Sequence, residues 1–162
     1  MVSAESIVRS WIVRDSAELV DRIATMRPRL LAIARSMRAR EPEDLVQSTI
    51  ETAIRHADQL REEDKLWPWL VAIQVRELFR WSRRLRALVV AAAGEPDVVE
   101  MKTFTDLRVA LDSLPPRIRA AVVLHYMADL SVADTARALG TSENTVKSQL
   151  KVGLSRLKEA LA

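Results

Sequence analysis

The sequence has 162 residues, 49% of them hydrophobic, and a formal net charge of +3, so we expect a folded chain with a core and exclude wholesale disorder. It contains no cysteine and only two histidines, His56 and His125, which excludes disulfides and thiolate metal sites; we expect neither a metal nor a cofactor. Residues 1–14 lack the pattern of a secretion signal and the longest apolar run, residues 87–93, is too short to cross a bilayer, so we expect a cytoplasmic protein without membrane insertion.

The first half of the chain predicts three amphipathic helices. Apolar residues recur at spacings of three and four over residues 16–38, where Pro28 is expected to kink or divide the helix. A second helix is expected to begin at Pro42, because proline suits a first helical turn, and to end near Leu60. A third is expected over about residues 66–85.

Acidic and basic residues are concentrated in different segments of these helices. Acidic residues predominate from Glu41 to Asp64, whereas five arginines and one acid, Glu77, lie between Arg76 and Arg86. On the third helix the side opposite the apolar stripe is predicted to carry Trp69, Ile73, Arg76, Arg80, Arg83 and Arg84. Different faces of the protein are therefore expected to bind different partners.

The second half of the chain predicts further short helices after an interruption. Helical periodicity fades over residues 88–104, where Gly94 and Pro96 interrupt it, so this stretch is predicted to be a linker. A short helix is expected before Pro115, and the next is expected to bury Ile118, Val122, Val123 and Tyr126. We therefore predict an all-α fold of two small helical domains, residues 1–87 and 105–162, joined by that linker.

The last two predicted helices are joined by a tight turn. Ser131 precedes Asp134 by three residues, a spacing typical of a helix start, and Gly140 suits the sharp end of that helix. Thr141 and Ser142 are expected to cap the final helix. Its inward residues are predicted to be Val146, Leu150, Leu154 and Leu157, and its outward residues Glu143, Asn144, Lys147, Ser148 and Lys151.

Two helices joined in this way make a helix-turn-helix. Amide, hydroxyl and ammonium groups at the front of the second helix suit the donor and acceptor pattern of the DNA major groove and its phosphates. The same residues also fit the solvated face of an ordinary helical hairpin, and the residue types alone leave both interpretations open.

Longer motifs give a resemblance to a known family. Residues 111–161, with LPPR, AVVLHYM, LSVADTARALG and TVKSQL, resemble region 4 of bacterial sigma factors, especially the small extracytoplasmic-function group. Residues 43–53, EDLVQSTIETA, resemble the polymerase-binding motif of region 2. Residues 67–84, WPWLVAIQVRELFRWSRR, resemble the helix that handles the minus-ten element. The resemblance covers about residues 16–160 in the expected order.

The resemblance implies a promoter-specific initiation factor that binds core RNA polymerase. Its polymerase contacts, on the clamp helices of the largest subunit, would be Asp44, Leu45, Val46 and Gln47, with Ser48 and Glu51 on or near the same exposed side. The separated minus-ten strand would lie on Arg76, Arg80, Arg83 and Arg84, with the loop of residues 61–66 where relatives hold a flipped base. The minus-thirty-five element would contact Ser142, Glu143, Asn144, Thr145, Lys147, Ser148 and Lys151.

The resemblance also implies partners and a location. We expect promoter DNA, core polymerase and an anti-sigma factor as partners, no small-molecule substrate, and a cytoplasmic, nucleoid-associated protein. The chain departs from the family pattern at Arg76 and Arg80, where Asn and Asp are usual, and at Val152 and Gly153, where an arginine usually follows the recognition helix.

Other functions remain as alternatives. A sigma mimic would sequester an anti-sigma factor, although its relatives carry a receiver domain for which 162 residues leave no room. An autonomous helix-turn-helix regulator would use its first half for dimerisation or sensing. A helical enzyme is the most distant alternative, because no set of nucleophile, base and orienting residue is evident, so we expect no enzymatic activity.

Overall fold

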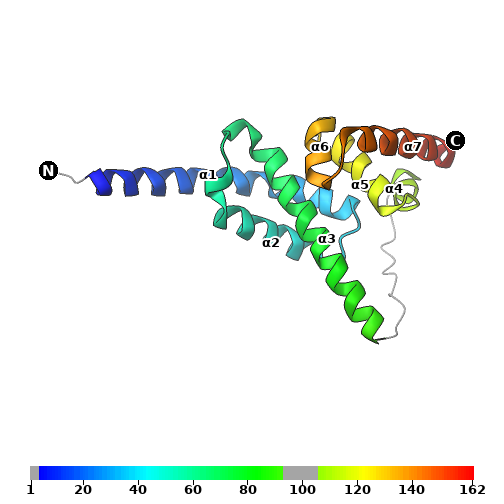
Figure 1. Cartoon of the computed structure of the whole chain (residues 1–162), viewed down its shortest axis with the longest axis horizontal. Coiled ribbons are helices and arrows are strands. Elements are labelled where there is room, and N and C mark those ends of the chain that lie inside the picture. Colours follow the sequence, from blue (N-terminus) through cyan, green and yellow to red (C-terminus); the bar gives the residue numbers. More distant parts are fainter. Residues whose placement is uncertain (1–3, 93–105) are drawn as a thin grey trace.

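The computed structural model describes residues 4–92 and 106–162, with side chains from residue 17 to 84 and from 106 onward. Seven α-helices follow one another in these ranges, and no strand occurs there, which confirms the all-α fold. They are α1 (Ala4–Ser36), α2 (Pro42–Arg55), α3 (Leu66–Ala92), α4 (Asp106–Asp112), α5 (Pro116–Val122), α6 (Val132–Leu139) and α7 (Glu143–Leu161) (Figure 1). Short 3-10 turns occupy Ala57–Gln59 and Glu63–Lys65, and a π-helical segment, Val123–Met127, continues α5.

Helices α1, α2 and α3 pack together as an N-terminal unit. Pro28 lies inside α1 and does not divide it, so that part of the prediction was wrong. Ile23 and Leu30, on either side of the proline, are both fully buried in the core. Burying two such side chains contributes about 3–6 kcal/mol, which offsets the roughly 3 kcal/mol cost of an internal proline.

The third helix is longer than its sequence pattern predicts. It continues to Ala92, so residues 88–92 of the expected linker are helical. The remainder of that expected linker lies outside the described residues. Trp67, Trp69 and Trp81 all pack partly buried against the core, although Trp69 was predicted on the side opposite the apolar stripe.

Helices α4 to α7 form a C-terminal unit around a second core, which includes Leu111, Leu114, Val146, Leu150 and Leu157. One inward prediction here was wrong, because Tyr126 is 53% exposed. The π-helical segment widens the turn, so Tyr126 no longer lies on the face that regular α-helical spacing assigns to it.

Leu154 was also predicted to be buried, but it is 38% exposed. Its place against α5 is taken by Gly153, where an added Cβ would lie 2.6 Å from Val122 Cγ2 and 3.1 Å from Ile118 Cγ2. The glycine therefore permits a backbone approach between α5 and α7 that no larger residue allows without movement.

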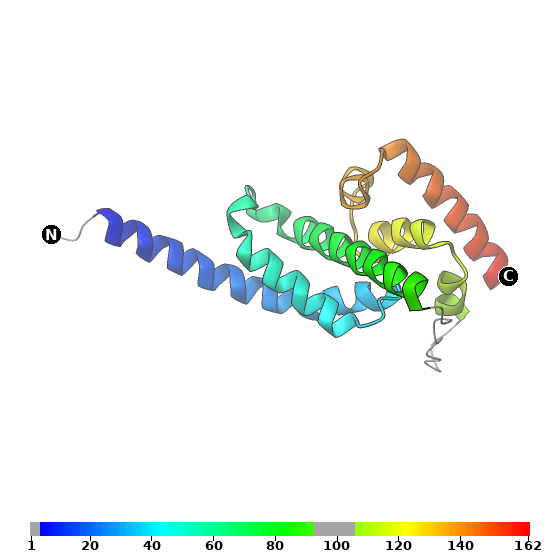
Figure 2. The ribbon, with the colours of Figure 1, turned by 60° about the horizontal axis from the view of Figure 1, so that its bottom comes forward.

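The two units are in contact. Helix α6 packs against α3, and the π-helical segment contacts α1 (Figure 2). The core of the N-terminal unit includes residues from the end of α5, the π-helical segment and the start of the helix-turn-helix, among them Val123, Leu124 and Leu130. The described residues therefore form a continuous packed structure.

Candidate nucleic-acid and polymerase interfaces

The helix-turn-helix is built from the local signals that the sequence predicted. The Ser131 hydroxyl accepts a hydrogen bond from the Asp134 backbone amide at 3.0 Å and so caps α6. Gly140 ends α6 in the left-handed region, with φ of 63°. The Ser142 hydroxyl accepts from the Thr145 amide at 3.1 Å and caps α7. The two caps and the left-handed glycine together fix the angle at which α7 leaves the turn.

The outward face of α7 presents polar groups free of the core. Every side chain predicted to contact DNA there is exposed: Ser142, Glu143, Asn144, Thr145, Lys147, Ser148 and Lys151. Val146 and Leu150 on the opposite face are buried. A rigid helix thus offers an amide, hydroxyls and ammonium groups to one side, an arrangement that suits a major groove and its flanking phosphates.

Helix α3 carries a basic edge formed by Arg76, Arg80, Arg83 and Arg84, all exposed. Ile73 was predicted on this side but is 3% exposed and belongs to the core. The Arg76 Nε group donates to the Ala72 carbonyl at 3.3 Å, which lays the guanidinium back along the helix. The guanidinium planes along this edge can neutralise phosphates and stack on unpaired bases.

Glu77, the one acid among the arginines between Arg76 and Arg86, is a buried carboxylate beside this edge. It is 7% exposed, and its Oε2 atom forms an ion pair with Arg80. The same oxygen accepts a hydrogen bond from the Ser48 hydroxyl at 3.2 Å. The i, i+3 spacing of Glu77 and Arg80 is a sequence signal that predicts the ion pair, whereas the contact with Ser48 depends on how α2 packs against α3.

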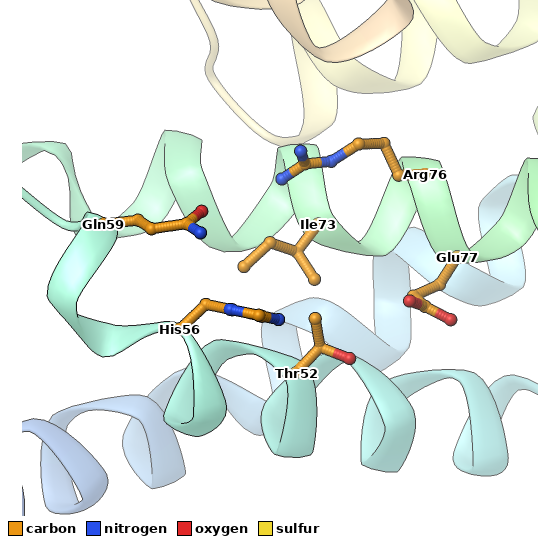
Figure 3. Close-up of a pocket in the computed structure, with 6 residues that line it drawn as sticks. All are labelled: Thr52, His56, Gln59, Ile73, Arg76 and Glu77. Atoms are coloured by element: carbon orange, nitrogen blue, oxygen red, sulfur yellow. The ribbon is translucent and has the colours of Figure 1, made fainter.

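A pocket opens between α2 and α3 next to the arginine edge. It has a volume of about 300 Å³ and is lined by Thr52, His56, Gln59, Ile73, Arg76 and Glu77 (Figure 3). Figure 3 shows His56 and Thr52 on the α2 side, facing Ile73 and Glu77 of α3, with Arg76 at the rim. None of residues 61–66, the loop in which a flipped base was expected, lines this pocket.

The face of α2 predicted to bind polymerase divides into exposed and buried positions. Asp44, Gln47 and Glu51 are exposed, and the Gln47 amide donates to Glu51 Oε1 at 3.0 Å. Leu45 and Val46 are fully buried in the core, so they hold the helix in place and offer no surface to a partner. Ser48 is half-buried by its contact with Glu77. The exposed surface of this motif is therefore confined to its polar positions.

The start of α2 is fixed by an ion pair with α1. The Arg35 guanidinium lies 2.8 Å from Glu43 Oε1. This hydrogen bond, together with one from the backbone, holds the pKa of Glu43 below its usual range. Glu43 and Asp44 also lie in the first turn of α2, where the helix dipole favours negative charge.

Within residues 17–84 and 106–162, no group of three or more histidine, cysteine, aspartate or glutamate side chains is arranged to hold a metal ion. None of the helices described there is both long and apolar enough to cross a membrane.

Comparisons with known proteins cover both units. Residues 23–87 match the family described as Sigma-70 region 2, and residues 104–157 match the family described as Sigma-70, region 4. The first range includes the α2 motif, the pocket and most of α3, and the second includes α6, the turn and most of α7. The two matches occur in the order that the sequence predicted.

Curated relatives carry the same assignment across most of their length. The chain is 32% identical over 142 residues to the ECF RNA polymerase sigma factor EcfG of Rhodopseudomonas palustris, covering 82% of this chain and 78% of the relative. It is 33% identical over 136 residues to the ECF RNA polymerase sigma factor SigM of Mycobacterium tuberculosis, covering 81% and 69%.

A solved structure has a similar arrangement of both units. The sigma factor RpoE of Bartonella quintana, crystallised in complex with the anti-sigma factor NepR, matches with a TM-score of 0.76 and 26% identity, over 87% of this chain and 94% of RpoE. The agreement of two family matches, of relatives above 30% identity and of the overall fold leads to one assignment. The chain belongs to the family of ECF RNA polymerase sigma factors, which direct transcription initiation from promoters.

Proposed function

We propose that the chain divides promoter recognition between its two units while both are bound to core RNA polymerase. The exposed face of α7 would contact the minus-thirty-five duplex, and the arginine edge of α3 would hold the separated minus-ten strand. The observation that supports this division best is that the polar face of α7 is exposed on a helix that is capped and packed along its other side.

The pocket beside α3 suits a single unstacked base of the minus-ten strand. Arg76 at its rim can approach a phosphate or a base edge, and Ile73 supplies an apolar surface inside it. The Glu77 carboxylate accepts hydrogen bonds and repels carbonyl oxygens, so it favours a base with an exocyclic amine over thymine. The Arg76 and Glu77 pair would then give this chain a base preference of its own.

The acidic face of α2 would bind the clamp helices of the polymerase. Asp44 and Glu51 supply the charge, and Gln47 lies between them. Charged groups at such an interface contribute orientation and association rate more than raw affinity. Bond formation would belong to the polymerase, and the chain itself would have no enzymatic activity.

Holding both units on one large enzyme makes two modest DNA contacts act together, because the second contact becomes intramolecular once the first has formed. RpoE was crystallised in complex with the anti-sigma factor NepR, and the similarity of this chain to RpoE supports an anti-sigma factor as its partner too. A sigma mimic would bind such a partner without starting transcription.

Run-off transcription with purified core polymerase and a pool of random promoters tests the proposal directly. We expect transcripts that depend on the added chain and that share two sequence elements upstream of their start sites. Binding of the chain to an anti-sigma factor without any chain-dependent transcript would support a mimic. Specific duplex binding in the absence of polymerase would support an autonomous regulator.

A further inference from the structure

Glu77 connects helix α2 with the arginine edge of α3. Its buried Oε2 atom accepts a hydrogen bond from the Ser48 hydroxyl of α2 at 3.2 Å and forms an ion pair with Arg80, three residues along α3. A buried carboxylate is tolerated when its charge is paired and its oxygens accept hydrogen bonds. Ser48 and Arg80 meet that requirement from two helices, so the three side chains form one polar bridge.

This bridge leaves most of the Arg80 guanidinium available to a ligand. Glu77 occupies one of its nitrogens, Nη2, and the Arg80 side chain is still 48% exposed. A guanidinium carries five N–H donors in a fixed plane. Arg80 can therefore donate to a DNA phosphate while it keeps its contact with Glu77, and the carboxylate and the phosphate would hold two parts of one rigid group.

Of the four arginines on this edge, Arg80 alone has a carboxylate partner in the part of the chain that the structure describes. An arginine side chain that moves freely loses rotamer freedom when it binds a phosphate. A side chain that is already held loses less, so more of the interaction energy contributes to affinity. The ion pair with Glu77 thus prepares Arg80 for binding.

The direction of the effect separates this role of Glu77 from a simple effect of its charge. A carboxylate close to a DNA strand repels the phosphates, so Glu77 acting through its charge alone would weaken DNA binding. Glu77 acting by holding Arg80 in place would strengthen it. Removal of the carboxylate charge therefore has opposite consequences in the two cases.

We infer that Glu77 and Ser48 are positioning residues for Arg80, which they orient toward a phosphate of the separated minus-ten strand. This inference rests on the proposed function, because that function assigns Arg80 to the strand. It is separate from the base preference proposed for the pocket, which Glu77 also lines (Figure 3). Ser48, which the resemblance places near the polymerase-binding face, would serve the DNA-binding edge of α3 instead.

The salt dependence of strand binding tests the inference. A fluorescent single strand with the minus-ten region of a promoter from the run-off pool is titrated with the preformed polymerase complex over a salt series, and anisotropy gives the affinity. Each phosphate contact to a single strand contributes about 0.7 to the slope of log affinity against log salt. Glu77→Gln should lower the slope by about 0.3–0.7 and weaken binding about two- to fivefold at 0.1 M salt. Tighter binding or an unchanged slope would overturn the inference.

A double-mutant cycle shows whether Glu77 acts through Arg80. Arg80→Ala should lower the slope by about 0.7, and the addition of Glu77→Gln to that variant should lower it no further. A loss of stability or a changed base preference alters the affinity but not the number of phosphates contacted, so neither mimics this result. A further fall in slope would show that Glu77 acts independently of Arg80 and would overturn the inference.

Two further variants complete the test. Asp58→Asn removes the same charge from an exposed position in the turn Ala57–Gln59, so its slope should equal that of the unmodified chain. An equal fall in Asp58→Asn and Glu77→Gln would indicate a general charge effect and overturn the inference. Ser48→Ala removes one hydrogen bond to Glu77 and should lower the slope less than Glu77→Gln does. An unchanged slope in Ser48→Ala would exclude Ser48 from the positioning role.

The same titration separates the inference from the proposed function. If the unmodified complex fails to bind the single strand, the proposed function is wrong and the inference fails with it. If the unmodified complex binds the strand and Glu77→Gln leaves the slope unchanged, only the inference is wrong.

Discussion

The C-terminal unit fixes its DNA-facing helix through residues close in sequence, whereas the N-terminal unit builds its surface from residues far apart. Ser142 caps α7 through Thr145, three positions away. In contrast, Ser48 contacts Glu77 across 29 positions, and the Gln74 amide donates to the Leu30 carbonyl across 44. The difference means that substitutions on α7 should alter DNA binding with little effect on folding, whereas those around the pocket affect packing and binding together.

The largest expected effect is a loss of stability when a side chain is added at Gly153, where α5 and α7 approach closely. Gly153→Val would place side-chain atoms against Val122 and Ile118, and overpacking of this kind costs about 1–3 kcal/mol. Urea unfolding should show a lower midpoint. Val152→Ala, at a neighbouring exposed position, should stay within about 0.5 kcal/mol of the unmodified chain. Equal midpoints for the two variants would refute the close approach of α5 and α7.

A double change on α7 should remove binding energy without unfolding the unit. Lys147→Ala with Lys151→Ala removes two exposed ammonium groups, which should reduce the salt slope of minus-thirty-five binding by about 1.8 and weaken binding by roughly 60-fold at 0.1 M salt. Fluorescence anisotropy of the polymerase complex over a salt series measures both. An unchanged slope would show that these lysines do not contact phosphates.

Arg80→Ala tests the corresponding function on α3. We expect about a tenfold loss in strand opening, measured by permanganate reactivity of unpaired thymines, with duplex recognition by α7 intact. Because the change leaves the buried Glu77 carboxylate without its ion-pair partner, Arg80→Ala with Glu77→Gln separates lost DNA contact from lost packing. Equal losses in strand opening and duplex recognition would contradict the division between the units.

The same difference between local and distant contacts decides which features of the structure could be predicted from the sequence. The caps at Ser131 and Ser142 and the turn at Gly140 were predicted and confirmed, because each depends on neighbours within a few positions. Leu154 and Tyr126 were wrongly predicted to be buried. The spacing of apolar residues in an α-helix reveals neither the close approach of α5 and α7 at Gly153 nor the π-helical turn at Val123–Met127. The pocket and the Trp67 contact with Ala128 need the tertiary packing of three or more helices.

Ser142→Ala should have a moderate effect confined to the start of α7. Loss of the cap costs about 1 kcal/mol of helix stability and frays the turn that carries Glu143 and Asn144. Amide hydrogen exchange should increase in the first turn of α7. Ser155→Ala, at an exposed position in the middle of the same helix, is the control and should leave that exchange unchanged.

The smallest expected effect is a pH dependence at the start of α2. Because Arg35 lowers the pKa of Glu43 in the folded chain, its stabilisation is present above the unfolded-state pKa and is lost as pH falls through the folded-state value. Unfolding midpoints measured from neutral to acid pH should therefore fall slightly less in Glu43→Gln than in the unmodified chain. An identical fall in both would show that the ion pair makes no contribution.

The central proposal is that the two units recognise a promoter together only when both are bound to polymerase. Anisotropy of a labelled promoter, selected from the run-off pool and titrated with the chain alone and with the chain bound to core polymerase, measures this directly. We predict weak binding by the free chain that does not distinguish the promoter from a scrambled duplex, and tight, promoter-specific binding by the complex. Equally tight and specific binding by the free chain would contradict joint recognition that depends on polymerase.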